Sequence, residues 1–146
     1  MDVRPRICCL GARMGVRTVE QLVAFQVAVE FKREVYRIVE RHPEIGWDIR
    51  FKGQLMDAAM GLESDLAEGF ARNRPAEFAQ FIRYGLASLA EAKRRLLDGV
   101  ARNYFADSEC RSALEINERC LSLCRNLHRS LAPFIKARPE RRRNRR

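Results

Sequence analysis

Apolar residues recur along most of this chain at steps of three and four, the spacing that places side chains on one face of an α-helix. The clearest run comprises Leu55, Ala59, Leu62 and Leu66. A second run follows a short polar interval and comprises Phe78, Ile82, Gly85, Leu89, Ala92 and Leu96. These runs predict one helix that ends near Phe70 and another that extends from Pro75 to about Arg102.

The connection between these two helices carries its own signals. Gly69 is expected to adopt the left-handed conformation that ends many helices, because glycine has no Cβ to clash there. Pro75 suits the first helical position, where a missing N–H costs nothing. Glu77 then lies in the first turn, where the helix dipole favours a negative charge. A connection this short makes the two helices antiparallel.

Two more amphipathic helices flank this pair. The first is predicted over residues 18–41, with Thr18 as its N-terminal cap and Pro43 as the residue that stops it. Asp48 is the expected cap of the next helix. The last helix begins near Asp107 and continues to the arginine-rich C-terminal segment.

Four long helices joined by short connections predict an all-α fold, an up-down-up-down antiparallel four-helix bundle over residues 18–137. Residues 1–17 are expected to form a disordered basic leader, and residues 138–146 a disordered arginine-rich tail. Besides the N-terminal methionine, Met14 is a second candidate for the first residue. Trp47, the one tryptophan, is interpreted as a plug over an end of the bundle.

The first predicted helix has more apolar surface than one neighbour requires. Its apolar arc spans roughly 220°, whereas a bundle helix needs little more than ~100°. The surplus either packs against a second neighbour within the bundle or faces another subunit. If it faces another subunit, the oligomer interface contains Leu22, Phe25, Val29 and Tyr36.

The formal charge of +9 is concentrated at the two ends of the chain. Residues 1–17 carry +3 and residues 138–146 carry +5, which leaves +1 for the predicted bundle. The sequence pI of about 9.9 is therefore weak evidence that the whole bundle surface is basic.

The predicted topology nevertheless collects positive charge at one end of the bundle. It brings together the start of the first helix, the turn between the second and third, and the end of the fourth. The side chains that this end would offer to nucleic-acid phosphates are Arg72, Arg74, Arg129, Lys136, Arg138, Arg141, Arg142, Arg143, Arg145 and Arg146. Contacts of this kind position a nucleic acid without reading its sequence.

Cysteine usage and hydropathy restrict the class of protein further. The five cysteines are an odd set without the spacing of a disulfide framework, which indicates a reduced, cytoplasmic protein. No apolar run approaches the ~20 residues of a membrane-spanning helix, so no membrane association is expected.

One set of residues has the donor types of a zinc site. Cys120, Cys124 and His128 are spaced at i, i+4 and i+8. One straight helix can direct two such side chains at a metal but hardly three, and no fourth ligand is evident. The simpler interpretation is two core cysteines and one histidine at the rim, with no metal and no cofactor.

The acidic residues Glu63, Asp65 and Glu68 form a cluster without a partner for general acid–base catalysis, and a solvated face is the simpler interpretation. No serine–histidine or cysteine–histidine pair is accompanied by a third, orienting residue. The sequence therefore predicts no catalytic residue and a protein that is not an enzyme.

The central stretch carries a more specific pattern. Its residues are Gln54-Leu55, Ala58-Ala59, Asp65-Leu66-Ala67-Glu68-Gly69, Glu77-Phe78, Phe81-Ile82, Ala87-Ser88-Leu89 and Glu91. This pattern resembles the small four-helix-bundle family encoded within intervening sequences of bacterial 23S ribosomal RNA genes, whose signature is asparagine-isoleucine-alanine-glutamate-glycine. Asp65 replaces the usual asparagine, and residues 86–88 depart from the usual glycine-serine pair.

The resemblance implies a homopentameric bundle without known catalysis and in association with RNA. A similar fold serves as the accessory variability determinant of diversity-generating retroelements, a basic pentameric barrel that binds a reverse transcriptase and nucleic acid. This chain lacks the glycine-glycine-tryptophan ending of that subgroup, so the retroelement protein is treated as a relative in fold.

Two functions are therefore expected as alternatives. In the first, an oligomer binds structured RNA or another nucleic acid through the basic end and the arginine-rich tail. In the second, the oligomer is a scaffold or adaptor for a protein partner, such as a reverse transcriptase, and the basic ends only keep it in solution.

Overall fold

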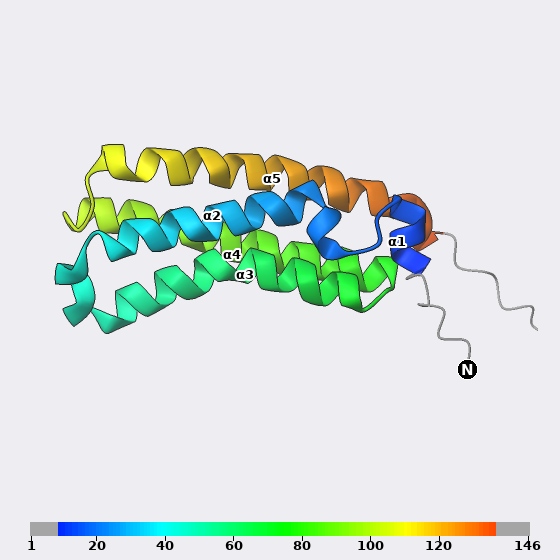
Figure 1. The fold of residues 1–146 in the computed structure, drawn as a ribbon, viewed down its shortest axis with the longest axis horizontal. Helices are drawn as coiled ribbons and strands as arrows, with labels where there is room; N and C mark the ends of the chain where they lie inside the picture. The colour runs from blue at the N-terminus through cyan, green and yellow to red at the C-terminus, as the bar shows by residue number, and fades with distance from the viewer. Residues whose placement is uncertain (1–8, 137–146) are drawn as a thin grey trace, which may run out of the picture.

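The computed structural model describes residues 9–136 and places four long helices side by side (Figure 1). Its elements are α1 (Cys9–Met14), the 3₁₀-helix η1 (Val19–Gln21), α2 (Val23–Glu40), the 3₁₀-helix η2 (Pro43–Trp47), α3 (Ile49–Ala71), α4 (Pro75–Ala101) and α5 (Asp107–Lys136). The chain runs up and down through α2 to α5, and the described range contains no strand. The predicted all-α antiparallel four-helix bundle is confirmed.

The apolar stripes predicted from the sequence form the core of the bundle. The largest fully buried side chains are Leu10, Phe31, Val35, Ile38, Leu55, Leu62, Leu66, Phe78, Ile82, Leu89, Leu96 and Leu131. Burial of each such side chain stabilises the fold by about 1.5–3 kcal/mol. One polar side chain shares this interior: the Asn117 amide of α5 donates to the Leu89 carbonyl of α4 over 3.0 Å.

Helices α3 and α4 pack especially closely because glycines lie at their contact. A Cβ built at Gly69 would lie 2.5 Å from Phe81 Cβ, and one at Gly85 would lie 2.7 Å from Leu62 Cδ1. The prediction that Gly69 ends its helix is therefore wrong, because Gly69 lies buried inside α3. The left-handed position after α3 belongs to Asn73, with φ of 57°.

Of three predicted helix starts, two agree with the structure and one differs from it. Asp48 caps α3, where its side chain accepts the Phe51 N–H over 3.0 Å, and Pro75 is the first residue of α4. Thr18 makes no side-chain cap. Instead, Leu22 is extended and separates η1 from α2, so the first long helix begins at Val23.

Residues 1–17 are predicted to form a disordered leader, but the structure describes a folded segment from Cys9 onward. Residues 9–14 form α1, and its Leu10 side chain is fully buried. The Leu10 N–H donates to Asn73 Oδ1 over 2.9 Å, which ties α1 to the α3–α4 turn. Residues 1–8 and the tail predicted at 138–146 lie outside the described residues.

The other end of the bundle is closed by residues different from the predicted plug. Trp47 is 74% exposed and touches Tyr104 edge-on, with ring centroids 6.1 Å apart. Ile45, Phe51 and Phe105 are the buried residues at this end. The interpretation of Trp47 as a plug is therefore wrong, since η2 places the indole outside the core.

Within residues 9–136, no helix combines the length and the apolar character that crossing a membrane would require.

Candidate nucleic-acid interface

The α3–α4 turn and the end of α5 meet at one end of the bundle, as predicted, and α1, which was not predicted, lies there with them (Figure 1). We call this end the α1 end. It comprises α1, the α3–α4 turn and the C-terminal part of α5. Leu10 is bonded to Asn73 of the turn, and the Arg13 guanidinium lies over the Phe134 ring of α5 at 5.5 Å.

The predicted phosphate-binding arginines of the turn are partly engaged within the chain. Arg72 Nη2 lies 2.8 Å from Glu68 Oε1, and its guanidinium lies 5.4 Å from the centre of the Phe81 ring. The hydrogen bond to Glu68 raises the pKa of Arg72. Arg74 Nη1 lies 3.5 Å from a Glu77 oxygen. Each of these two arginines therefore has a carboxylate beside it, which weakens its electrostatic attraction for a phosphate.

The remaining predicted residues fall into two groups. Arg129 is exposed on α5 and pairs with no carboxylate in the described range; its guanidinium contacts Asn126 Oδ1 at 3.4 Å. Lys136 is the last residue of α5. The six predicted tail arginines, Arg138, Arg141, Arg142, Arg143, Arg145 and Arg146, lie outside the described residues.

A groove between α4 and α5 brings Arg129 together with two arginines that the sequence analysis missed. It has a volume of about 470 Å³ and is lined by Arg83, Leu86, Arg125, His128, Arg129 and Ala132. Within residues 9–136, no acidic residue lines it and none of its three arginines forms an ion pair, although the charge of Arg125 is near enough to act on Glu118. We call it the α4–α5 basic groove.

Part of this groove has a signal in the sequence. Arg125 and Arg129 are four residues apart, which places both on one face of a helix. Arg83 lies on another helix far away in sequence, and only the packing of α4 on α5 brings it to the same groove.

The candidate zinc ligands of α5 diverge in the structure. Cys120 and Cys124 are fully buried, and burial raises the pKa of Cys120 to about 12 and that of Cys124 to about 11. His128 lies instead in the α4–α5 basic groove. Within the described part of the chain, no group of three or more His, Cys, Asp or Glu side chains is placed to hold a metal ion.

The three acidic residues of the predicted cluster, all on α3, also point to different surroundings. Glu63 Oε2 lies 2.5 Å from Lys32 Nζ of α2, and Glu68 pairs with Arg72. Asp65 is half-buried beside Gly85; burial, and secondarily the charge of Glu68, raises its pKa. They do not form a common site.

The residues predicted for an oligomer interface lie mostly within the bundle. Leu22 is only 7% exposed, and Phe25 and Tyr36 pack half-buried against the core. Val29 is half-buried as well. The wide apolar arc of the first helix therefore packs largely against α3 and α5, the neighbours of α2.

More exposed apolar surface lies on α3. Ile49 is 78% exposed and Met60 is 41% exposed, and the half-buried Met56 lies between them on the same helical face. Gly53 and Ala67 share this face, as their spacing from Met56 and Met60 indicates. We call this surface the α3 outer face.

Comparison with known proteins gives one match. The family model described as 23S rRNA-intervening sequence protein matches residues 20–127, a range that holds α2, α3, α4 and most of α5. The matched range includes Arg72, Arg83 and Arg125 and ends before Arg129. Searches of curated proteins and of solved structures give no match. Since the family model covers most of the chain and the bundle agrees with it, this chain belongs to the 23S rRNA-intervening sequence protein family.

Proposed function

We propose that this protein is a non-enzymatic, cytoplasmic oligomer that binds structured RNA. The observation that carries the proposal is the α4–α5 basic groove, in which three arginines converge without a carboxylate between them. Its family name connects the protein to ribosomal RNA genes and makes RNA the first nucleic acid to test.

The groove has the chemistry of a phosphate-backbone contact. Guanidinium groups donate bidentate hydrogen bonds to phosphate oxygens, and such contacts become stronger when no internal carboxylate competes. Leu86 and Ala132 add apolar surface, and the His128 imidazole is the one aromatic ring among the described lining residues. A single ring can stack on at most one base, and we expect recognition mainly of shape and charge, with little dependence on sequence.

The groove also extends the predicted binding surface. Arg129 belongs both to the predicted set at the α1 end and to the groove. An RNA that runs along the α4–α5 basic groove toward the α1 end would also reach the exposed Arg13 and Arg74. The C-terminal arginines that follow α5 in sequence would add further phosphate contacts.

The test is fluorescence anisotropy of the full chain with a structured ribosomal RNA fragment over a series of salt concentrations. Replacing Arg83, Arg125 and Arg129 by Gln should weaken binding and reduce the slope of log K against log salt by about 3, roughly one for each lost phosphate contact. The control changes three exposed arginines, Arg33 and Arg37 of α2 and Arg41 just after it, to Gln.

Both triple variants have the same net charge, so the comparison separates a site from a general effect of charge. Equal weakening by the two variants would contradict a binding groove. Absence of wild-type binding at low salt would contradict the function itself.

The alternative function, a scaffold for a protein partner such as a reverse transcriptase, rests on the α3 outer face. Exposed large apolar side chains at helical spacing are typical of surfaces that bind another chain. We assign this face to self-association, because Gly53 and Ala67 would permit a second helix to approach closely. A scaffold without RNA binding would form the same oligomer and show no response in the anisotropy experiment.

A further inference from the structure

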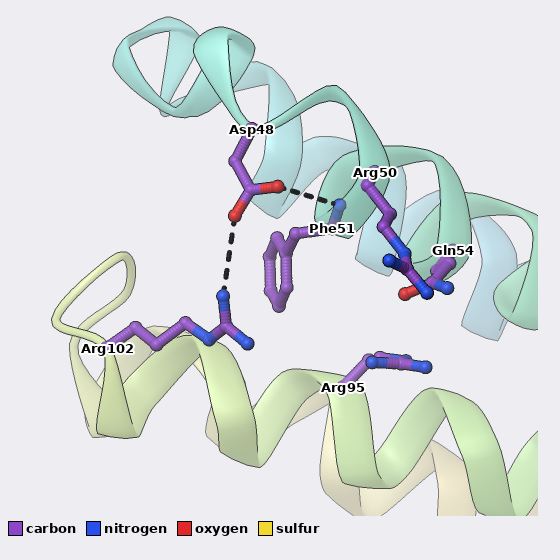
Figure 2. Close-up of a pocket in the computed structure, with 6 residues that line it drawn as sticks. All are labelled: Asp48, Arg50, Phe51, Gln54, Arg95 and Arg102. Carbon is purple, nitrogen blue, oxygen red and sulfur yellow. Dashed lines mark hydrogen bonds and ion pairs between the residues drawn. The ribbon is translucent and has the colours of Figure 1, made fainter.

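A second concentration of arginines lies at the end of the bundle opposite the α1 end. There the start of α3 and the last turns of α4 enclose a pocket of about 390 Å³, drawn in Figure 2. Its lining residues are Asp48, Arg50, Phe51, Gln54, Arg95 and Arg102. We call it the α3–α4 pocket.

One wall of this pocket is held in place by internal contacts. Asp48 Oδ1 accepts the Phe51 N–H over 3.0 Å, and Asp48 Oδ2 accepts the Tyr104 hydroxyl over 2.9 Å. Arg102 Nη1 lies 3.4 Å from Asp48 Oδ2, and Arg102 Nε lies 3.0 Å from Asp98 Oδ2. The guanidinium also lies 5.7 Å from the centre of the Phe51 ring. The one carboxylate in the lining is therefore occupied by donors of the protein.

The other wall carries donors whose internal partners are weaker. Arg50 forms no ion pair within residues 9–136, although its charge is near enough to act on Asp48, and the Gln54 amide has no hydrogen-bond partner there. Arg95 has one distant ion pair, 3.5 Å from Glu91 Oε1. Figure 2 shows Arg50 and Gln54 extending from α3 toward Arg95 on α4.

Two guanidinium groups that face one opening repel each other, and an anion between them removes that cost. Phosphate suits the opening best, because a guanidinium presents parallel N–H groups that match two phosphate oxygens. Arg50 also lies in the first turn of α3, where the helix dipole favours a negative charge. The volume of about 390 Å³ lies in the usual range for small-ligand sites.

We propose that the α3–α4 pocket binds a phosphate group, with Arg50 and Arg95 as its two clamps and Gln54 as a neutral donor between them. The site is distinct from the α4–α5 basic groove. Arg83 and Arg95 are twelve residues apart on α4, which separates them by roughly 18 Å along the helix axis. The phosphate can be a free anion or part of a nucleic acid, and the chemistry of the clamp is the same for both.

The test is isothermal titration of the full chain at low, constant ionic strength. The probes are inorganic phosphate and a short oligoribonucleotide prepared with either a 5′-phosphate or a 5′-hydroxyl group. Wild-type protein should bind at least one probe saturably, and the double variant Arg50→Gln/Arg95→Gln should bind it at least tenfold more weakly. A control with the same charge, Arg33→Gln/Arg37→Gln, should stay within twofold of wild type.

The probes identify the source of the phosphate. Tighter binding of the 5′-phosphorylated oligonucleotide supports a terminal phosphate, and equal binding of both oligonucleotides supports an internal phosphodiester. Binding of inorganic phosphate alone supports a small anion. Lack of saturable binding by all three probes overturns the proposal, as does equal weakening by the control.

A second measurement keeps the test independent of the variants. In wild-type protein, backbone and side-chain NMR signals of Arg50, Gln54 and Arg95 should shift on addition of the bound probe, and those of Arg125 should stay unchanged with inorganic phosphate. Shifts that spread over all exposed arginines would overturn the assignment. If the variant of the α4–α5 basic groove loses RNA binding but still binds phosphate, the groove and the α3–α4 pocket act as separate sites. The failure of one proposal can then be told from the failure of the other.

Discussion

At the scale of single residues, His42 is a histidine that the fold connects to two carboxylates. Its Nδ1 lies 2.6 Å from Glu44 Oε1, and its Nε2 lies 2.9 Å from Glu109 Oε1 at the start of α5. The hydrogen bond to Glu44 is the main cause that raises the pKa of His42 above 6.5, and Glu109 adds to it. Backbone N–H groups, and secondarily His42, lower the pKa values of Glu44 and Glu109.

This arrangement predicts how stability depends on pH. Because the pKa of His42 is raised in the folded state, its contribution is fully present below about pH 6.5 and is lost as the pH rises through the raised value. The free energy of unfolding from urea titrations should therefore fall as the pH rises above about 6.5. His42→Gln should remove that decrease, whereas His128→Gln should keep it. A decrease that survives in His42→Gln would assign the pH dependence to other groups.

At the scale of helices, the contact of α3 with α4 depends on glycines whose role in packing cannot be predicted from the sequence pattern alone. Gly69 and Gly53 lie in the same helix, yet a Cβ at Gly69 meets Phe81 and Phe78, whereas a Cβ at Gly53 meets nothing within 4 Å. The same substitution should therefore have opposite effects at the two positions.

Gly69→Ala should lower the free energy of unfolding by about 1–3 kcal/mol, because Phe81 and Phe78 must move and the core becomes overpacked. Gly53→Ala should raise the free energy of unfolding of the single chain by up to about 1 kcal/mol, since alanine favours the helix and no atom of the same chain lies within 4 Å of the added Cβ. Urea denaturation of both variants checks this. If Gly69→Ala proved neutral, the two helices would be packed less tightly than described.

At the scale of the whole molecule, the α3 outer face predicts how the protein assembles. We expect an oligomer whose mass is a multiple of the 16.9 kDa chain, five-fold if the pentamer implied by the family resemblance forms. The double variant Ile49→Glu/Met60→Glu should dissociate it, because each charge would be buried at the contact between subunits. Sedimentation velocity gives the masses directly.

The matched control is Leu97→Glu, which changes an apolar side chain of α4 that is 46% exposed and lies outside the α3 outer face. This variant should keep the wild-type mass. Dissociation by Leu97→Glu alone would place the interface on α4, and an unchanged mass for all variants would contradict self-association through α3.

The sequence by itself determined the number, type and order of the four long helices, but not the short helices α1, η1 and η2. Steps of three and four between apolar residues are a local property, and each stripe needs a neighbour to cover it. The cap at Asp48 and the helix start at Pro75 were equally predictable, because each depends on the chemistry of a few adjacent residues.

Only the tertiary structure decided which residues meet across helices. The rotation of α3 about its axis buried Gly69, the extended connection before α2 buried Leu22, and η2 left Trp47 outside. The rotation of the long helices also joined Arg83 to Arg125 and opposed Arg50 to Arg95. These pairs are distant in sequence, and their positions follow from how side chains of neighbouring helices interlock, which periodicity along one chain does not encode.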